Sequence, residues 1–258
     1  MGDQAMTKQR IEVITMWFNE EFLAPFFLNH YRFADRINLI LDADTTDGTA
    51  KIASMYPNVE IQMFKFPDMM DEMIKVNRIN QCYIGLDCDW VICVDADEFI
   101  FPLPDVTWTR KFLSEVKEGN VVKAAMWNVY RHHSDEDLDP AMEPVVMQRR
   151  HGDPNMGKTE NAPYVKPIVC RPKAHDGWSV GNHHIKPNTS TKLADEWLAG
   201  AHWANADPCF CIERRLKGRR DRQSKNNLAN RMTFQHHGIA EQDVLRLCQA
   251  HANDPQLF

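Results

Sequence analysis

The sequence predicts an α/β fold in which a mixed, mostly parallel β-sheet carries helices on its faces. Short β-rich runs alternate with amphipathic segments over residues 11–101, and this alternation is typical of βαβ units. Clusters of acidic and amide residues follow several of these runs directly. Ligands of open parallel sheets bind where the carboxyl ends of strands converge, so the sequence predicts a binding site at that edge.

The first half of the chain contains clear strand and helix patterns. We expect strands where apolar and β-branched residues form short runs, and helices where apolar residues recur at helical spacing, as in Phe22, Phe26 and Phe27. The expected strands are residues 11–16, 37–41, 59–64 and 90–94, and the expected helices are residues 22–31, 49–55 and 71–86.

The second half is less regular, and its pattern predicts fewer elements. We expect a helix at 108–118, a strand at 121–130, loops at 132–162, a strand pair at 164–171 and 178–185 around a turn at 174–177, a basic segment at 213–235 and a final helix at 240–250. No interdomain linker is visible, so we predict a single domain over residues 1–258.

Composition and charge exclude several classes of protein. The 258 residues are 43% hydrophobic and 26% charged, with a formal net charge of −6, which lacks the basic footprint of a general nucleic-acid-binding protein. The seven cysteines include no Cys-x-x-Cys pair, so we expect reduced, mostly buried thiols and a cytoplasmic location. We expect no signal peptide, and no run reaches the roughly 20 apolar residues of a transmembrane helix.

The motif Asp95-Ala96-Asp97 directly follows the buried run 91–94. Residues two apart in an extended segment point the same way, so Asp95 and Asp97 are expected to face one ligand. Two close carboxylates repel unless a cation joins them, and a hard divalent cation with a diphosphate meets that need. The alternative is a pair of surface acids at a turn; the position after a buried strand favours the cation.

Two further polar clusters follow predicted strands. The first is Asn19-Glu20-Glu21, and the second is the loop 42–49, which begins with Asp42. Asp47-Gly48-Thr49 has the composition of a turn and a helix cap. An acid at a strand end also accepts hydrogen bonds from a nucleobase or a ribose, so both interpretations of this loop stay open.

Together these motifs resemble the GT-A fold glycosyltransferases, specifically the family-2-like enzymes. The resemblance lies in residues 17–21 (WFNEE), 42–49 (DADTTDGT) and 90–99 (WVICVDADEF), in the order and spacing of that family. Residues 166–168, 181–184 and 201–203 are similar to a bacterial subgroup with Asp-x-Asp and a carboxy-terminal metal-ligand histidine. The chain lacks the Glu-Asp pair and the Gln-x-x-Arg-Trp motif of the commoner members.

The resemblance implies transfer of a sugar from a nucleotide-sugar, a UDP- or GDP-sugar, to a hydroxyl of a glycan or lipid-linked acceptor. Residues 11–101 would bind the donor, and residues 102–258 would bind the acceptor and supply a carboxy-terminal lid. The implied role is bacterial surface glycan synthesis in the cytoplasm, with peripheral association at the inner face of the membrane and no nucleic-acid partner.

The resemblance also implies a metal and its ligands. Asp97 would ligate Mn²⁺ or Mg²⁺, His202 would be a further ligand, and Asp95 would contact the metal, a water bound to it or the ribose. The residues implied to bind the donor are Trp17, Asn19, Glu21, Asp42, Lys75, Asp95 and Lys217.

Two basic groups have alternative interpretations. Lys75 and Arg78, on the helix before the Asp-x-Asp strand, would approach the diphosphate or lie on a solvated helix face. The run 214–220, which contains Lys217, is either a clamp for the leaving diphosphate or another solvated helix face.

The catalytic base is the least defined part of the predicted site. Inverting transfer requires a carboxylate that deprotonates the acceptor hydroxyl. Asp176 is the first candidate, with Glu160 and Asp153 as rivals, although Asp176-Gly177 is also an ordinary turn sequence. A retaining enzyme would need no such base.

Two other functions stay open at this point. A nucleotidyltransferase also places acidic metal ligands on an α/β sheet, but it usually has a Gly-rich basic loop where this chain has residues 19–21. A non-catalytic carbohydrate-binding protein on the same fold would show no metal-dependent donor binding.

Overall fold

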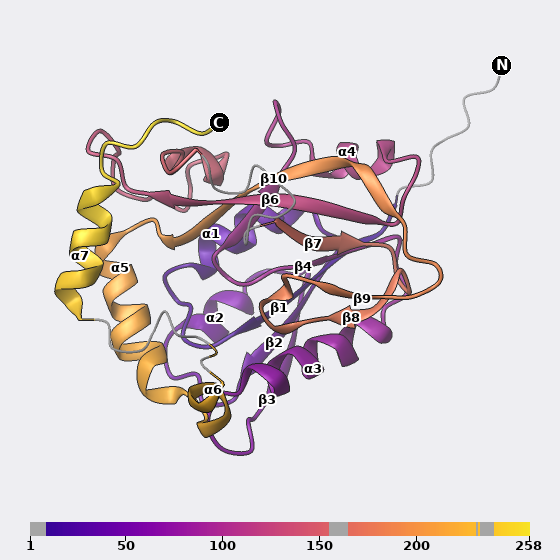
Figure 1. The fold of residues 1–258 in the computed structure, drawn as a ribbon, viewed down its shortest axis with the longest axis horizontal. Helices are drawn as coiled ribbons and strands as arrows, with labels where there is room; N and C mark the ends of the chain where they lie inside the picture. The colour runs from indigo at the N-terminus through magenta and orange to yellow at the C-terminus, as the bar shows by residue number, and fades with distance from the viewer. Residues whose placement is uncertain (1–8, 155–164, 231, 233–239) are drawn as a thin grey trace.

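The computed structural model describes residues 9–154, 165–230, 232 and 240–258. Its centre is an eight-stranded sheet with the strand order β3-β2-β1-β4-β7-β6-β10-β5 (Figure 1). Parallel pairing joins β1 to β2 and β4, β2 to β3, and β6 to β10, whereas β7 runs antiparallel to β4 and β6, and β5 to β10. The predicted mixed, mostly parallel α/β fold is confirmed.

The elements follow the chain in an alternating order at first and a less regular one later. The strands are β1 (Ile11–Trp17), β2 (Arg36–Asp42), β3 (Val59–Phe64), β4 (Trp90–Cys93), β5 (Glu98–Phe101), β6 (Val121–Tyr130), β7 (Val165–Cys170), β8 (His175–Trp178), β9 (Ile185–Pro187) and β10 (Leu193–Asn205). The helices are α1 (Ala24–His30), α2 (Thr49–Ala53), α3 (Glu72–Ile84), α4 (Thr109–Glu115), α5 (Pro208–Ile212), α6 (Lys225–Ala229) and α7 (Glu241–Ala250), and a π-helical segment, Glu213–Arg219, continues α5.

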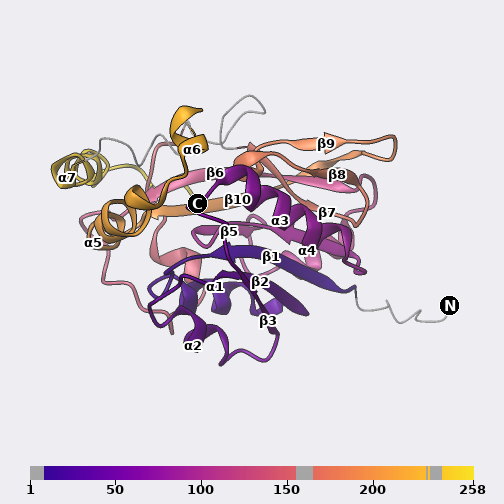
Figure 2. The ribbon, with the colours of Figure 1, turned by 90° about the horizontal axis from the view of Figure 1, so that it is seen from below.

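Helices cover both faces of the parallel half of the sheet. Figure 2 shows α3 on one side of β1–β3 and α1 and α2 on the other. Along β1, Ile11 and Val13 join the apolar cluster that includes Phe27 of α1, whereas Ile14 and Met16 join the cluster under α3. Every residue of β1 is therefore buried, as expected for a strand covered on both faces.

The pairing register brings the polar clusters of the sequence to one edge. Trp17, near the end of β1, pairs with Leu41 of β2, and Ile14 pairs with Cys93 at the end of β4. Because these three strands are parallel, the residues that follow them leave the sheet on the same side. The predicted convergence of strand-end clusters is thus a property of the fold.

The predicted strand pair at 164–171 and 178–185 is wrong. β7 belongs to the main sheet, and the residues predicted as a turn form β8, which pairs with β9 in a separate two-stranded sheet. Asn80 of α3 explains the difference, because its side chain accepts a hydrogen bond from Trp178 N at 2.8 Å and donates to Trp178 O at 3.0 Å. This tertiary contact overrides the local turn preference of Asp176-Gly177.

Two strands of the main sheet were missing from the prediction. β10 has 13 residues and lies between β6 and β5, and its first part is mostly exposed, including Asp195 and Glu196. β5 begins with Glu98, directly after the Asp-x-Asp motif. Both strands have partners far away in the sequence, and the local pattern carries no signal for such pairing.

The predicted final helix is confirmed as α7, which packs beside α5 (Figure 1). After α7 the chain returns to the segment that follows β6, where Leu257 N donates to Arg150 O at 2.8 Å. All seven cysteines are free thiols, and Cys209 is the exposed one. None of the described helices is both long and apolar enough to cross a membrane.

His175 is a buried histidine that the fold accommodates in its neutral form. It is 2% exposed, stacks on Tyr83 and contacts Trp178 edge to face. Its Nδ1 accepts a hydrogen bond from Gly177 N at 2.9 Å. Burial lowers the pKa of His175 from 6.5 to about 4.

We predict that His175 makes the protein less stable in mild acid. The unfolded chain binds this proton near pH 6.5, whereas the folded protein binds it near pH 4, so the contribution to the free energy of unfolding is complete above about pH 6.5 and is lost towards pH 4, by roughly 3 kcal/mol. Urea unfolding at about pH 7 and about pH 4.5 should show a smaller loss in His175→Phe. Equal losses in both proteins would contradict the prediction.

Candidate active site

A cavity of about 550 Å³ lies at the carboxyl ends of β1, β2 and β4, a volume typical of small-molecule sites. The segment after α5 also lines it. The acidic residues of its lining are Glu20, Asp42, Glu72, Asp95, Asp97 and Glu98, and the basic ones are Lys75, Lys166, His183, His202, Arg215, Arg219 and Arg222. Charges of both signs therefore face one cavity.

Asp97 occupies the turn between β4 and β5 and is 3% exposed. The backbone of this turn is held by Trp203 N, which donates to Asp97 O at 2.7 Å. The Asp97 Oδ2 atom forms an ion pair with Arg214 and lies 3.4 Å from Nε2 of His202 on β10. Asn128 of β6 orients His202 through a contact of 2.7 Å between its Oδ1 and His202 Nδ1. The structure thus brings Asp97 and His202 together.

Arg214 is a buried cation that bridges two carboxylates from distant parts of the chain. Its side chain is 6% exposed; it pairs with Asp97, and its Nη2 lies 2.8 Å from Glu20 Oε1. Arg219 Nη2 lies 2.8 Å from the same Glu20 oxygen. The other oxygen, Glu20 Oε2, is buried without a hydrogen-bond partner.

These contacts shift the pKa values of the partners. Burial by itself would raise the pKa of Asp97, but the charges of Arg214 and His202 outweigh it and hold this pKa well below its usual range. Burial would lower the pKa of Arg214, and the two carboxylates raise it above its usual value instead. Both groups are therefore ionised in the folded protein.

Two lysines form ion pairs with Asp95 of the Asp-x-Asp motif and with Glu98, which follows the motif. Lys75 Nζ on α3 lies 2.8 Å from Asp95 Oδ1, and Lys166 on β7 forms an ion pair with Glu98 on β5. The other Glu98 oxygen accepts a hydrogen bond from Asp95 N at 3.1 Å. Although burial opposes ionisation, Lys75 and Lys166 keep the pKa of Asp95 below its usual range.

Asp42, at the end of β2, forms a further ionic contact of the cavity. Arg222 Nη2 lies 2.9 Å from Asp42 Oδ2, and the guanidinium carbon lies 3.5 Å from the centre of the Phe18 ring. Trp17, buried beside Phe18, also lines the cavity. A buried carboxylate next to an aromatic face forms a place where a flat heterocycle could both hydrogen-bond and stack.

Asp97 and His202 suit a shared divalent cation. Two ligand atoms 3.4 Å apart can bind one ion, because bonds from such ions to carboxylate oxygen or imidazole nitrogen are about 2.0–2.2 Å long. One carboxylate and one imidazole leave positions for phosphate oxygens and water, as Mg²⁺ and Mn²⁺ prefer. Asp95 stands apart, because within the described residues it does not join Asp97 and His202 in a set of three ligand atoms within 4.8 Å.

No protein-family model and no curated protein matches this chain. Among solved structures, it is similar to TarS of S. aureus in complex with UDP-GlcNAc, at 14% identity and a TM-score of 0.47 over 80% of this chain and 64% of that one. It is also similar to glucosyl-3-phosphoglycerate synthase of Mycobacterium tuberculosis in complex with Mn²⁺, UDP and phosphoglyceric acid, at 12% identity and a TM-score of 0.31 over 46% of this chain and 43% of that one. The chain spans less than two thirds of the length of either protein, and these likenesses concern the fold alone.

Asn19 and Glu21, both predicted to contact the donor, do not line the cavity. Asn19 Oδ1 accepts a hydrogen bond from Thr46 N at 2.8 Å, and Glu21 Oε2 accepts one from Gly48 N at 3.0 Å. Both side chains therefore hold the loop after β2 against the end of β1. The structure gives them a positioning contact with the loop that begins at Asp42.

The two predicted base candidates that the structure describes, Asp176 and Asp153, do not line the cavity. Asp176 on β8 is exposed, accepts a hydrogen bond from Asn188 Nδ2 at 3.0 Å and does not line the cavity. Asp153 does not line it either. Glu160 lies outside the described residues.

The basic residues of the prediction divide between the cavity and the surface. Lys75 lines the cavity, whereas Arg78 donates to Gln62 Oε1 at 2.9 Å and does not line it. The side chain of Lys217 is outside the described part of the chain. In the same run Arg215 and Arg219 line the cavity, so this segment is more than a solvated helix face.

Several lining residues were given no role by sequence reasoning, above all Glu20, Lys166 and Arg222, although residues 166–168 were among those that resemble the bacterial subgroup. Glu20 is the middle member of a strand-end cluster that the sequence did single out, and its position was a usable signal. Arg222 follows the basic run by two residues. No local signal indicates that Lys166 meets Glu98, because the contact depends on the pairing of β7 with β4, the strand that ends shortly before Glu98.

We predict that Arg214→Met destabilises the protein and sensitises it to Mn²⁺. The change leaves Asp97 and Glu20 buried with less charge compensation, which costs about 3 kcal/mol in the free energy of unfolding. Chemical denaturation measures the loss, and Mn²⁺ should raise the melting temperature of the variant more than that of the unchanged protein, since no guanidinium competes for Asp97. Arg220→Met is the control, because Arg220 is exposed and pairs with Asp221; matching behaviour of the two variants would refute the prediction.

Proposed function

We propose that this protein transfers a sugar from a UDP- or GDP-sugar to a hydroxyl of a glycan or lipid-linked acceptor. The observation that carries the proposal is the proximity of Asp97 and His202, whose ligand atoms lie 3.4 Å apart in a cavity that Lys75, Arg215 and Arg219 also line. A divalent ion commonly accompanies a diphosphate, and basic side chains stabilise a departing diphosphate. The motifs that resemble GT-A glycosyltransferases lie at the same edge of the sheet, and a role in bacterial surface glycan synthesis at the cytoplasmic face of the membrane rests on that resemblance.

Asp42 and Phe18 would receive the nucleoside of the donor. The Asp42 carboxylate, buried at the end of β2, would accept hydrogen bonds from the base, and the Phe18 ring would stack on it. Arg222 now contacts both residues. It would give up this position when the base enters and remain close enough to meet a phosphate.

Asp97 and His202 would hold Mn²⁺ or Mg²⁺. When bound, the ion supplies positive charge that stabilises the departing nucleoside diphosphate. Asp95, kept ionised by Lys75, would contact the ribose or a water on the ion. Arg214 would exchange its contact with Asp97 for a phosphate oxygen, because a guanidinium binds carboxylate and phosphate with the same geometry.

Glu72 is the cavity carboxylate best placed to take a proton from the acceptor hydroxyl. The other five carboxylates of the lining each pair with a described lysine or arginine. Glu72, at the start of α3, forms no ion pair among the described side chains, and its charge interacts with Lys75, which pairs with Asp95. Its oxygens are therefore available to accept a proton. Asp176 stays the alternative, from outside the cavity.

The test of donor binding uses a panel of nucleotide-sugars with and without Mn²⁺. We expect Mn²⁺-dependent thermal stabilisation and release of nucleoside diphosphate for at least one donor, and Asp97→Asn should weaken this binding by on the order of 100-fold. Pyrophosphate release from a nucleoside triphosphate would indicate a nucleotidyltransferase. Metal-dependent binding without turnover would indicate a binding protein, and no stabilisation by any donor would reject the proposal.

The test of the base compares Glu72→Gln with Asp176→Asn. Glu72→Gln should lower kcat by on the order of 100-fold while the KM for the donor changes little, because general-base catalysis contributes about that much. Asp176→Asn should keep nearly full activity. The reverse result would assign the base to Asp176, and two active variants would favour a mechanism without a carboxylate base.

A further inference from the structure

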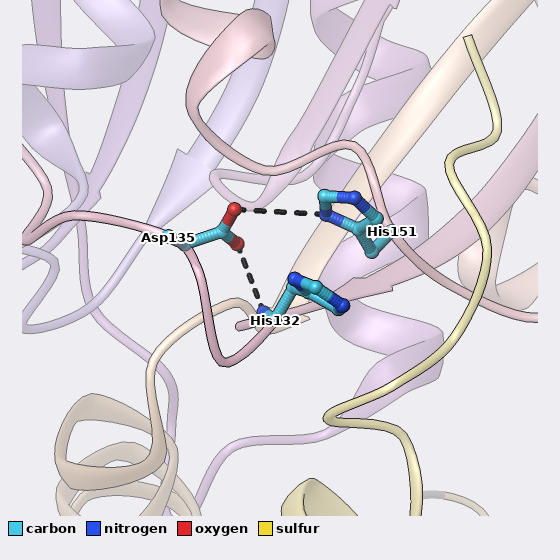
Figure 3. Close-up of side chains that lie close together, drawn as sticks. All are labelled: His132, Asp135 and His151. Atoms are coloured by element: carbon cyan, nitrogen blue, oxygen red, sulfur yellow. Dashed lines mark hydrogen bonds and ion pairs between the residues drawn. The ribbon is translucent and has the colours of Figure 1, made fainter.

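A second group of metal-ligating side chains lies outside the cavity described above. His132, Asp135 and His151 offer ligand atoms that all lie within 4.8 Å of one another (Figure 3), and all three side chains are partly buried. None of them lines the cavity. We propose that this cluster, the His132–Asp135–His151 site, binds a divalent transition metal of the Zn²⁺ class.

His151 supplies the clearest indication of a missing ligand. Its Nδ1 atom is buried and has no hydrogen-bond partner. The atom faces Asp135 Oδ1 at 3.6 Å, which is too long for a hydrogen bond. The same separation suits two ligands of one ion, because Zn²⁺ binds nitrogen and oxygen at about 2.0–2.2 Å. A metal between them would satisfy both atoms.

Local hydrogen bonds hold the other two side chains in place. His132 N donates to Asp135 Oδ2 at 2.9 Å, which leaves Oδ1 directed at His151. His132 Nδ1 lies 2.7 Å from Ser134 Oγ, and the His132 ring stacks on the His151 ring with centroids 4.2 Å apart. A hydrogen bond on one ring nitrogen fixes the orientation of a ligating imidazole, so the site is largely preorganised.

The ligand set indicates which metals would bind. Two imidazoles and one carboxylate suit Zn²⁺, Co²⁺, Ni²⁺ and Cu²⁺, whereas Mg²⁺ and Ca²⁺ need more oxygen ligands. Arg149 Nη1 lies 3.8 Å from Asp135 Oδ2, so the site has little net negative charge. Hydrogen bonds to Ala206 O and Gln148 O, at 2.8 and 2.7 Å, anchor this guanidinium. The site therefore differs in kind from the Asp97–His202 pair.

The cluster also joins separate parts of the chain. His132 lies two residues after the end of β6, and His151 forms β-bridges to Tyr130, the last residue of β6, and to Gln256 in the carboxy-terminal tail. A metal here would hold the loop that ends at His151 onto β6. Because His151 also bridges to Gln256, metal binding would stabilise the packing of the carboxy-terminal tail against this loop.

The experiment titrates Co²⁺ into the untagged full chain and follows its visible absorption, then displaces it with Zn²⁺. We expect Co²⁺ to bind with high affinity and to give a visible absorption that Zn²⁺ abolishes. Zn²⁺ should also raise the melting temperature of the protein. His151→Asn and Asp135→Asn, each checked for native circular dichroism, should weaken Co²⁺ binding by about 10-fold or more. The second variant keeps the test informative if the first does not fold.

Two matched controls separate this site from others. His133→Asn removes a neighbouring imidazole that is outside the cluster, and this variant should bind Co²⁺ as the unchanged chain does. Asp97→Asn removes the proposed donor-site ligand; this variant should lose any Co²⁺ held by Asp97 and His202 but keep the Co²⁺ of the His132–Asp135–His151 site. Absence of Co²⁺ binding in the unchanged chain, or equal binding by the Asp135→Asn variant, would overturn the inference. Neither result depends on glycosyl transfer, so the two proposals fail separately.

Discussion

Neutralisation of buried carboxylates at the carboxyl edge of the sheet is the constraint on which the rest of this structure depends. The parallel strands β1, β2 and β4 deliver Glu20, Asp42 and Asp97 to one edge of the sheet, where each is at most 3% exposed. Isolated charges in such a place would be strongly unfavourable. Arginines from the segment after α5 meet all three acids, so the carboxy-terminal part of the chain completes the electrostatics of the amino-terminal part.

This charge balance explains how an irregular second half can form an ordered site. β6 and β10 place Asn128 beside His202, and β7 brings Lys166 to Glu98. The lysine and arginine side chains that pair with these acids are the groups that a diphosphate would attract. Under the proposed function, a donor and its metal would exchange partners with Arg214 and Arg222, and the net charge of the cavity would change little.

The two proposed metal sites use different physical means. At the donor site a carboxylate and an imidazole lie among many charges, and phosphate would complete the shell of a hard cation. At the His132–Asp135–His151 site the imidazoles dominate and a buried nitrogen lacks a partner. The first arrangement suits an ion that arrives with substrate, and the second suits one that remains bound and supports the loop after β6.

The sequence by itself determined the parallel half of the sheet, the helices that cover it and the motif that follows β4. These features are local, since strand and helix periodicity appear within a few residues. The carboxyl ends of parallel strands then lie at the same edge of the sheet in any fold of this class. Tertiary structure alone decided that Glu20 rather than Asn19 or Glu21 faces the cavity, that Arg214 bridges Glu20 and Asp97, and that residues 175–178 form a strand. The physical reason is that these outcomes depend on pairing and charge compensation between segments far apart in the chain, as between Glu20 and Arg214, and no local pattern encodes such partners.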